Sequence, residues 1–212
     1  WDPLRLMVED RMNHLLFRER YEFGVHLNLL RQQMASVIHV NVLVDLILRR
    51  LEASRRVTHA AIYLLEDFGL GYSSQGNVGP PPTRRLDRVT HHRFFNRLRE
   101  QPVLVSENLE RERRQLDEYG LLAGSGAMEE LESVLATLDA VNAGVCLAFL
   151  AEGQLLGFIT LKDERLREAY SSEEIRMLMG VAAQASLTIE NSRMFDRLRD
   201  RDRLAALGEM SA

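Results

Sequence analysis

The sequence predicts an α+β fold: a central antiparallel sheet with helices on both faces, flanked by long helices at both ends of the chain. Two hairpin patterns indicate the sheet. The strands predicted at residues 57–66 and 70–74 are separated by three residues, and those at 144–150 and 155–162 by a turn that contains Gly153. Strands joined by such short turns pair antiparallel. The flanking helices are indicated by apolar residues that recur every three or four positions near both termini.

The first flanking helix is predicted over residues 4–38, because Asp2-Pro3 suits an N-cap and a first helical position. A seam with the spacing of helix–helix contacts runs along it through Leu27, Leu30, Met34 and Val37. We expect a second helix over residues 42–55, with Asn41 as its N-cap. Its predicted buried face consists of Val44, Ile47, Leu48 and Leu51.

The centre of the chain alternates short predicted elements with breaks. Three consecutive prolines predict a loop over residues 76–83, because proline lacks the amide donor that a strand needs. Residues 107–118 are almost entirely charged and predict either a solvated helix or a mobile segment. The other elements expected here are a helix over 91–100, a strand over 103–105 and a helix over 128–141.

The strand predicted over residues 155–162 separates two faces of the sheet, because successive side chains point to opposite sides. We assign one face to the flanking helices, and there the small Gly157 would let a helix come close. The residues assigned to this face are Gly157, Ile159 and Leu161. The opposite face would lie beneath Phe94 and Phe95, where a small molecule could sit, and it carries Leu156, Phe158 and Thr160.

The second flanking helix is predicted over residues 171–212, with Ser171 or Ser172 as N-cap before two glutamates. An apolar stripe runs along the first part of this helix from Ile175 to Ile189. The stripe does not continue beyond Ile189, because its next positions are the polar residues Ser192, Asp196 and Arg199. Such a break changes local supercoiling, and we expect it to mark a point where two helix packings have similar energy. The expected dimer-forming and signalling positions are Ile175, Leu178, Ala182, Ala185, Ile189 and Leu198.

Composition limits the class of protein. The 212 residues carry a formal charge of −4 with acidic and basic side chains interspersed, which argues against a nucleic-acid partner. No apolar run reaches the ~18–20 residues of a membrane span. The single cysteine, Cys146, excludes an internal disulfide and a multi-cysteine zinc site, and predicts a reducing, cytoplasmic setting. No catalytic motif or metal-ligand cluster is identifiable, so we expect neither a catalytic residue nor a metal site.

Four runs, in this order, resemble a GAF domain. They are residues 42–51, the strand 60–65, the strand 153–161 and the helix start 170–175, and the last continues through Ala-Ala-Gln-Ala to Ile-Glu-Asn. With their surroundings they span roughly residues 27–191. The PAS fold, a competing sensor fold, lacks the flanking helix pair and the Ala-Ala-Gln-Ala helix.

The resemblance implies a sheet with one face against the first and last helices and the other against a pocket roofed by the intervening helices. Candidate pocket residues are Tyr63, Phe94, Phe95, Cys146, Phe158 and Thr160. The resemblance requires no cofactor and leaves the small-molecule ligand undefined.

The ligands of known relatives do not suit these residues. Relatives that bind cyclic nucleotides carry Asn-Lys, a spaced Phe and Asp-Glu, whereas this chain has Lys162-Asp163, Tyr170 and Glu173-Glu174. His91 and His92 cannot easily share a metal, because adjacent helical residues point in different directions, and only a single histidine is left for haem iron. Methionine-sulfoxide reduction needs several cysteines, and this chain has only Cys146, which is more simply a small buried hydrophobe. Cys146 could carry a bilin, but the motifs that surround a bilin cysteine are not recognisable here. We therefore expect neither haem nor a cyclic nucleotide.

Residues 204–212, Leu-Ala-Ala-Leu-Gly-Glu-Met-Ser-Ala, resemble the segment that leads into the phosphoacceptor helix of sensor histidine kinases, just before the phosphoacceptor histidine. The resemblance implies a signalling helix at 1–38, a GAF sensory domain at 39–191 and a linker helix at 192–212. It also implies a homodimer, kinase domains in the same chain and a response regulator as partners. The fragment itself is then not an enzyme.

Three other interpretations stay open: a degenerate GAF domain that serves only as a structural dimerisation module, a regulatory domain of another output such as a transcription activator or cyclase, and an enzyme. Side chains that fill the face under Phe94 and Phe95 would favour the first. The run at 204–212 argues against the second. Titration of candidate substrates would test the third.

Overall fold

The computed structural model describes residues 22–118, 125–165 and 170–209. In this part of the chain six strands form one sheet in the order β3-β2-β1-β6-β5-β4, and all neighbouring strands pair antiparallel. The predicted α+β class with an antiparallel sheet is therefore confirmed. The strands are β1 (His59–Leu65), β2 (Gly71–Val78), β3 (Arg85–Asp87), β4 (Val103–Val105), β5 (Val145–Ala151) and β6 (Gln154–Lys162).

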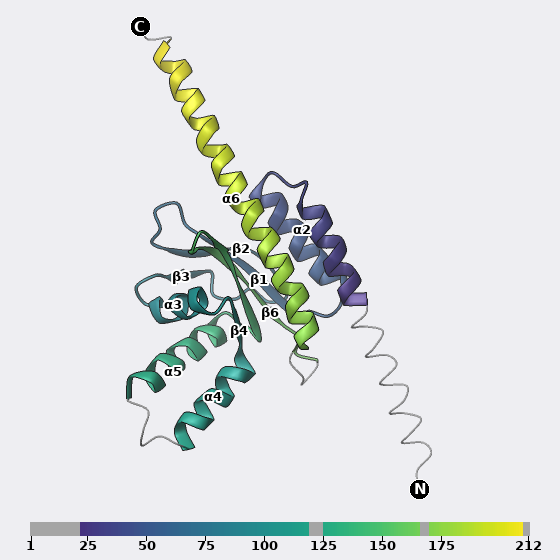
Figure 1. Cartoon of the computed structure of the whole chain (residues 1–212), viewed down its shortest axis with the longest axis vertical. Helices are drawn as coiled ribbons and strands as arrows, with labels where there is room; N and C mark the ends of the chain where they lie inside the picture. The colour runs from purple at the N-terminus through teal and green to yellow at the C-terminus, as the bar shows by residue number, and fades with distance from the viewer. Residues whose placement is uncertain (1–21, 119–124, 166–169, 210–212) are drawn as a thin grey trace.

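Helices cover both faces of the sheet (Figure 1). A helix over residues 22–34 lies with α2 (Val40–Ala53) and α6 (Ser172–Glu209) on one face. The other face carries α3 (His92–Glu100), α4 (Ser106–Glu118) and α5 (Ser125–Ala140). Each face has its own hydrophobic core, and the sheet separates the two. The charged segment 107–118 is thus helical, with Leu109 as its buried contact.

The N-terminal part of the chain differs from the prediction at two points. The first helix ends at residue 34 rather than 38, and α2 begins at Val40 without a side-chain cap, so Asn41 is not its N-cap. The seam residues Leu27, Leu30 and Met34 are buried in the core of their own chain. Residues 1–21, where most of the predicted first helix falls, lie outside the described residues.

Strand β2 continues through Gly76 to Val78, where a loop was predicted. Its backbone pairs with β1 as far as Ala60, and this pairing outweighs the low strand propensity of its polar residues. A Cβ on Gly76 would lie 2.8 Å from the Leu48 side chain, so glycine lets α2 approach the sheet. The short edge strand β3 was not predicted.

A bulge in β6 changes which residues face which core. Leu150 pairs with Leu155 and Phe149 with Gly157, which leaves Leu156 as the extra residue. Leu155 therefore joins the core beneath α3 and α5, and Leu156 the core beneath α6, opposite to the strict alternation that we assumed. Beyond the bulge, Phe158 faces the first of these cores, and Ile159 and Leu161 the second, as predicted.

Gly157 does not serve a helix, contrary to the prediction. A Cβ at this position would lie 2.3 Å from the Tyr63 carbonyl oxygen and 2.7 Å from the Leu64 side chain. Both belong to β1, the strand paired with it. The absent side chain therefore permits the close approach of β1 and β6 at the centre of the sheet.

The predicted stripe of α6 packs against the sheet of its own chain. Leu178, Ala182, Ala185 and Ile189 are buried, and Ile175 is partly buried against the same core. These five residues therefore face the core of their own chain, because a helix lying on a sheet buries its most apolar stripe there. Only Leu198 of the expected dimer positions is exposed.

Candidate functional site

An aromatic cluster fills the sheet face that the sequence assigned to a ligand. The Phe158 ring stacks on Tyr63 with 4.8 Å between centroids and lies edge-on to Phe94 at 5.5 Å. Phe95 and Tyr72 lie 6.2 and 5.7 Å from the same ring. All five side chains are buried. The rings therefore form the packing between α3 and the sheet.

Cys146 and Thr160 lie opposite each other on β5 and β6 in the same buried face. Burial raises the pKa of the Cys146 thiol, which stays protonated at neutral pH and is a poor nucleophile. The cavity beside Thr160 measures about 10 Å³, no more than one water molecule needs. The structure thus brings the six predicted pocket residues together, and their own side chains occupy the space between them.

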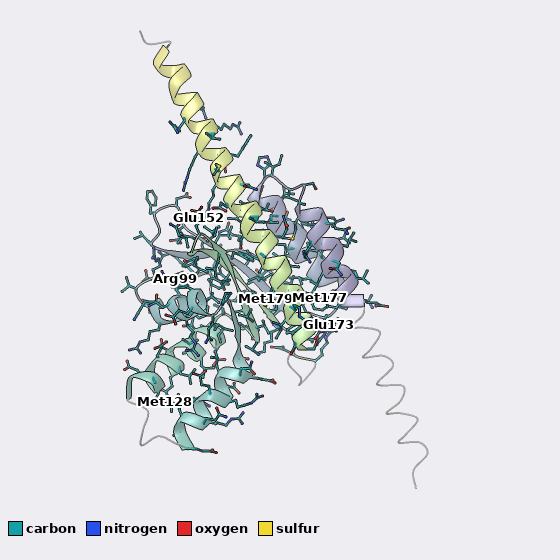
Figure 2. All side chains as sticks on the ribbon, in the orientation of Figure 1. Arg99, Met128, Glu152, Glu173, Met177 and Met179 are labelled. Atoms are coloured by element: carbon teal, nitrogen blue, oxygen red, sulfur yellow. The ribbon has the colours of Figure 1, made fainter. Side chains whose placement is uncertain are left out.

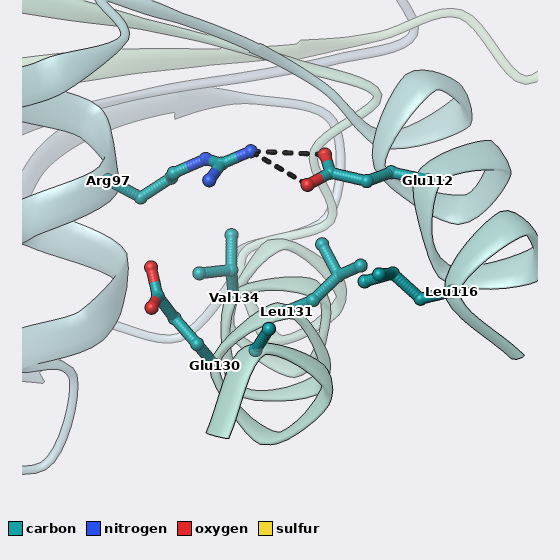
Figure 3. Close-up of a pocket in the computed structure, with 7 residues that line it drawn as sticks. Arg97, Glu112, Leu116, Glu130, Leu131 and Val134 are labelled. Atoms are coloured by element: carbon teal, nitrogen blue, oxygen red, sulfur yellow. Dashed lines mark hydrogen bonds and ion pairs between the residues drawn. The ribbon is translucent and has the colours of Figure 1, made fainter. Parts of the chain in front are cut away.

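A larger pocket, of about 140 Å³, lies between α3, α4 and α5 (Figure 3). Arg97 reaches from α3 to α4, where its Nη2 donates to both carboxylate oxygens of Glu112 at 3.0 and 3.2 Å. Glu130 of α5 lines the same pocket. The apolar lining includes Leu116, Leu131 and Val134.

A buried ion network occupies the region where cyclic-nucleotide-binding relatives carry their motif. Arg56 Nε donates to Glu174 at 3.1 Å and its Nη1 to Asp163 at 3.0 Å. The guanidinium lies 4.9 Å from the centroid of the Tyr170 ring. All three charged side chains are at most 3% exposed. These residues bind one another, and they hold the first turn of α6 against the ends of β1 and β6.

Ser171 and Glu174 also begin α6 by a reciprocal cap. The Glu174 amide donates to Ser171 Oγ at 3.3 Å, and the Ser171 amide donates to the Glu174 carboxylate at 2.7 Å. This capping box confirms the helix start predicted from the serines and glutamates. One carboxylate thus serves both the cap and the buried arginine.

The two adjacent histidines, His91 and His92, each have a hydrogen-bond partner within the protein. His91 Nδ1 lies 3.2 Å from Thr137 Oγ1, and burial lowers the pKa of this imidazole below its ordinary value. His92 Nδ1 lies 2.9 Å from the Val89 carbonyl oxygen. Across residues 22–118, 125–165 and 170–209, no three His, Cys, Asp or Glu side chains gather as a metal site would require.

The outward side of α6 carries exposed apolar residues. Leu187, Met194 and Leu198 are 55%, 59% and 53% exposed, and their spacing of seven and four residues places them on one side of the helix. Phe195 beside them is also exposed. Met179, nearer the helix start, is exposed as well (Figure 2). None of the described helices combines the length and apolar character of a membrane span.

The family model of the GAF domain matches residues 39–189. The chain belongs to the GAF domain family. The match covers the sheet, the aromatic cluster and α6 as far as Ile189. No curated protein matches the chain.

Solved structures with the same fold come from proteins of different activity. The GAF domain of an Acinetobacter phosphoenolpyruvate-protein phosphotransferase has a TM-score of 0.56 and 13% identity over 80% of this chain and 93% of its own. Residues 122 to 287 of a methyl-accepting chemotaxis protein have a TM-score of 0.57 and 12% identity over 78% of this chain and 98% of their own. Free methionine-R-sulfoxide reductase from Neisseria meningitidis, solved with its substrate, has a TM-score of 0.56 and 10% identity over 79% of this chain and 88% of its own. At such identities the likeness concerns the fold alone.

Sequence reasoning missed the two arginines that organise these sites. Arg56 follows Arg55 in the turn after α2, and nothing in the local sequence distinguishes the buried arginine from the exposed one. Arg97 lies in a helix that the sequence marks only by its phenylalanines. The one available signal was the charge density of α4, which supplies Glu112.

Proposed function

We propose that this GAF domain is the sensory module of a homodimeric histidine kinase and passes a change in its core along α6. One observation carries the proposal: α6 is a single helix from Ser172 to Glu209 that packs on the sheet as far as Ser192 and then leaves the domain (Figure 1). Arg193 makes a contact near this exit by donating to the Leu65 carbonyl at 3.1 Å. Residues 194–199 beyond it are exposed.

The exposed apolar residues of α6 support pairing with a second copy. Leu187, Met194 and Leu198 would form a seam along the helix of the kind that parallel helices bury between them. This seam replaces the stripe that we first assigned to the dimer, which the sheet already covers. It runs toward residues 204–212, the segment that resembles the lead-in to the kinase phosphoacceptor helix. The fragment itself then catalyses no reaction, and the kinase domains would address a response regulator.

Leu198→Glu is expected to weaken the dimer by about tenfold or more, because it places a charge in the apolar seam. The matched control is Val89→Glu, which adds the same charge at an exposed valine ahead of α3. Analytical ultracentrifugation at micromolar concentration measures the association. A wild-type chain that sediments as a single copy, or equal association of both variants, would contradict the proposal.

A second prediction concerns the rotation of α6. Insertion of one residue after the exposed Asp196 turns the following helix by about 100° relative to the domain, whereas insertion of seven residues nearly restores its orientation. In the full-length kinase we expect the one-residue insertion to change the autophosphorylation rate roughly 5-fold or more and to abolish its regulation. The seven-residue insertion should retain wild-type behaviour. Identical, fully regulated rates for both insertions would rule out signalling through helix orientation.

The filled aromatic face favours a second candidate, a GAF domain that serves only to hold the dimer together. The rings of Tyr63, Phe94 and Phe158 occupy the space that a ligand would need. This candidate also predicts a dimer, but it predicts full kinase activity when α6 is rotated. The pair of insertions after Asp196 therefore separates the two functions.

A further inference from the structure

The pocket between α3, α4 and α5 holds two charged groups of opposite sign that do not bind each other. Arg97 and Glu130 both line it, yet no ion pair within 4.0 Å joins them. Arg97 instead donates from its Nη2 to the Glu112 carboxylate (Figure 3). The two opposite charges thus line one pocket without pairing.

Each of these groups keeps an unused hydrogen-bonding position. In Figure 3 the other terminal nitrogen of Arg97 lies above Val134 and the carboxylate of Glu130 lies beside Val134, and both residues line the pocket. Among the described residues, neither this nitrogen nor the Glu130 carboxylate has a hydrogen-bond or ion-pair partner. Glu112 holds the guanidinium in place and cancels its charge in part, so an incoming group meets a fixed donor on one side and a carboxylate on the other.

The pocket floor between these charges is apolar. Leu131 and Val134 are buried, and Leu116 is partly buried against the same core. The volume, about 140 Å³, is close to the roughly 150 Å³ of an apolar cavity that accepts benzene. A compact aliphatic group therefore fits the floor.

We propose that this pocket binds a free α-amino acid with a compact aliphatic side chain. The α-carboxylate accepts hydrogen bonds from Arg97, the α-ammonium donates to Glu130, and the side chain lies on Leu131 and Val134. A zwitterion satisfies both unused groups at once, whereas a simple amine or a simple carboxylate satisfies only one. The ordered Arg97–Glu112 pair preorganises the carboxylate position.

Amino-acid binding in this pocket does not depend on the proposed function. Only the effect of binding on α6 rests on it. Leu131 and Val134 belong to the same hydrophobic core as Phe94 and Phe158, which packs against β1 and β6. An amino acid on Leu131 would press on this core, and through the sheet on α6. The pocket would then be the input of the sensor.

The test uses L-leucine, 4-methylpentanoate and 3-methylbutylamine, which share the aliphatic group and differ in the charged ones. Isothermal titration of the 212-residue chain should show leucine binding at least about tenfold tighter than either single-charge probe, as expected for one lost charged hydrogen bond. Arg97→Gln and Glu130→Gln should each weaken leucine binding by a similar factor. The matched controls are Arg93→Gln and Glu129→Gln, an ion pair of 2.8 Å on the same two helices, and they should leave binding unchanged.

Three results would overturn the assignment: no heat with leucine up to millimolar concentration, leucine affinity that is equal in all variants, or 3-methylbutylamine binding as tightly as leucine. The last would indicate a plain amine site. Leucine binding that follows the predicted variants but leaves kinase autophosphorylation unchanged would support the site and count against the sensor function. The two proposals therefore fail separately.

Discussion

Phe158→Ala is expected to destabilise the domain by about 3–5 kcal/mol, the range for a fully buried aromatic truncated in a packed core. Phe158 is 0% exposed and contacts the rings of Tyr63, Tyr72, Phe94 and Phe95. Its removal leaves a cavity between α3 and the sheet that these stiff rings cannot close. Urea unfolding followed by circular dichroism measures the loss.

Phe68→Ala is the matched control for this substitution. Phe68 lies in the β1–β2 turn and is 89% exposed, so its truncation should change the free energy of unfolding by no more than about 0.5 kcal/mol. If Phe158→Ala proved equally harmless, the aromatic face would be loosely packed and able to open for a ligand. The degenerate, purely structural alternative would then lose its main support.

Arg56→Met is expected to destabilise the domain by about 3–5 kcal/mol, because it leaves Asp163 and Glu174 as buried carboxylates without their shared cation. Arg165 still pairs with Asp163 at 2.9 Å, but that arginine is half exposed, so it offsets only part of the loss. The exposed pair Arg49–Asp45 supplies the control, and Arg49→Met should change the urea midpoint very little.

Acid titration gives an independent readout of the same network. Burial alone would raise the pKa of Asp163, but hydrogen bonds from Arg165 and Arg56 hold it below its ordinary value. A carboxyl with a lowered folded pKa stabilises the protein above its unfolded pKa, near 3.8, and this contribution is lost as pH falls through the folded value. The acid loss of stability should therefore be smaller in Arg56→Met than in the wild type. An equal or larger loss would contradict this assignment.

The network connects the sheet with the start of α6, the helix along which we propose that the signal passes. Glu174 serves both as a partner of Arg56 and as the cap of the helix. Arg56→Met should therefore loosen the first turn of α6 as well as lower overall stability. In the kinase that we propose, full regulation in this variant would show that the first turn has no part in transmitting the proposed signal.

Local pattern predicted the elements whose information is contained in neighbouring residues. The hairpin of β5 and β6, the short α3 and the helix start at Ser171 follow from turn residues, spacing and caps, and the structure confirms each of them. Local pattern was less informative where hydrogen bonds from a distant strand decide the structure. β2 extends through Gly76 because β1 offers hydrogen bonds there, and Leu155 and Leu156 exchange faces because β5 imposes a bulge.

The sequence by itself determined the α+β class, the GAF family resemblance and the residues that gather beneath α3, since apolar periodicity and turn chemistry are local properties. Only the tertiary structure decided which face of α6 is covered, that the aromatic rings fill their own pocket, and that Arg56 and Arg97 each meet carboxylates from distant elements. The physical reason is that an apolar stripe packs equally well on a sheet or on a second helix, and a charge shows its partner only after the chain has folded.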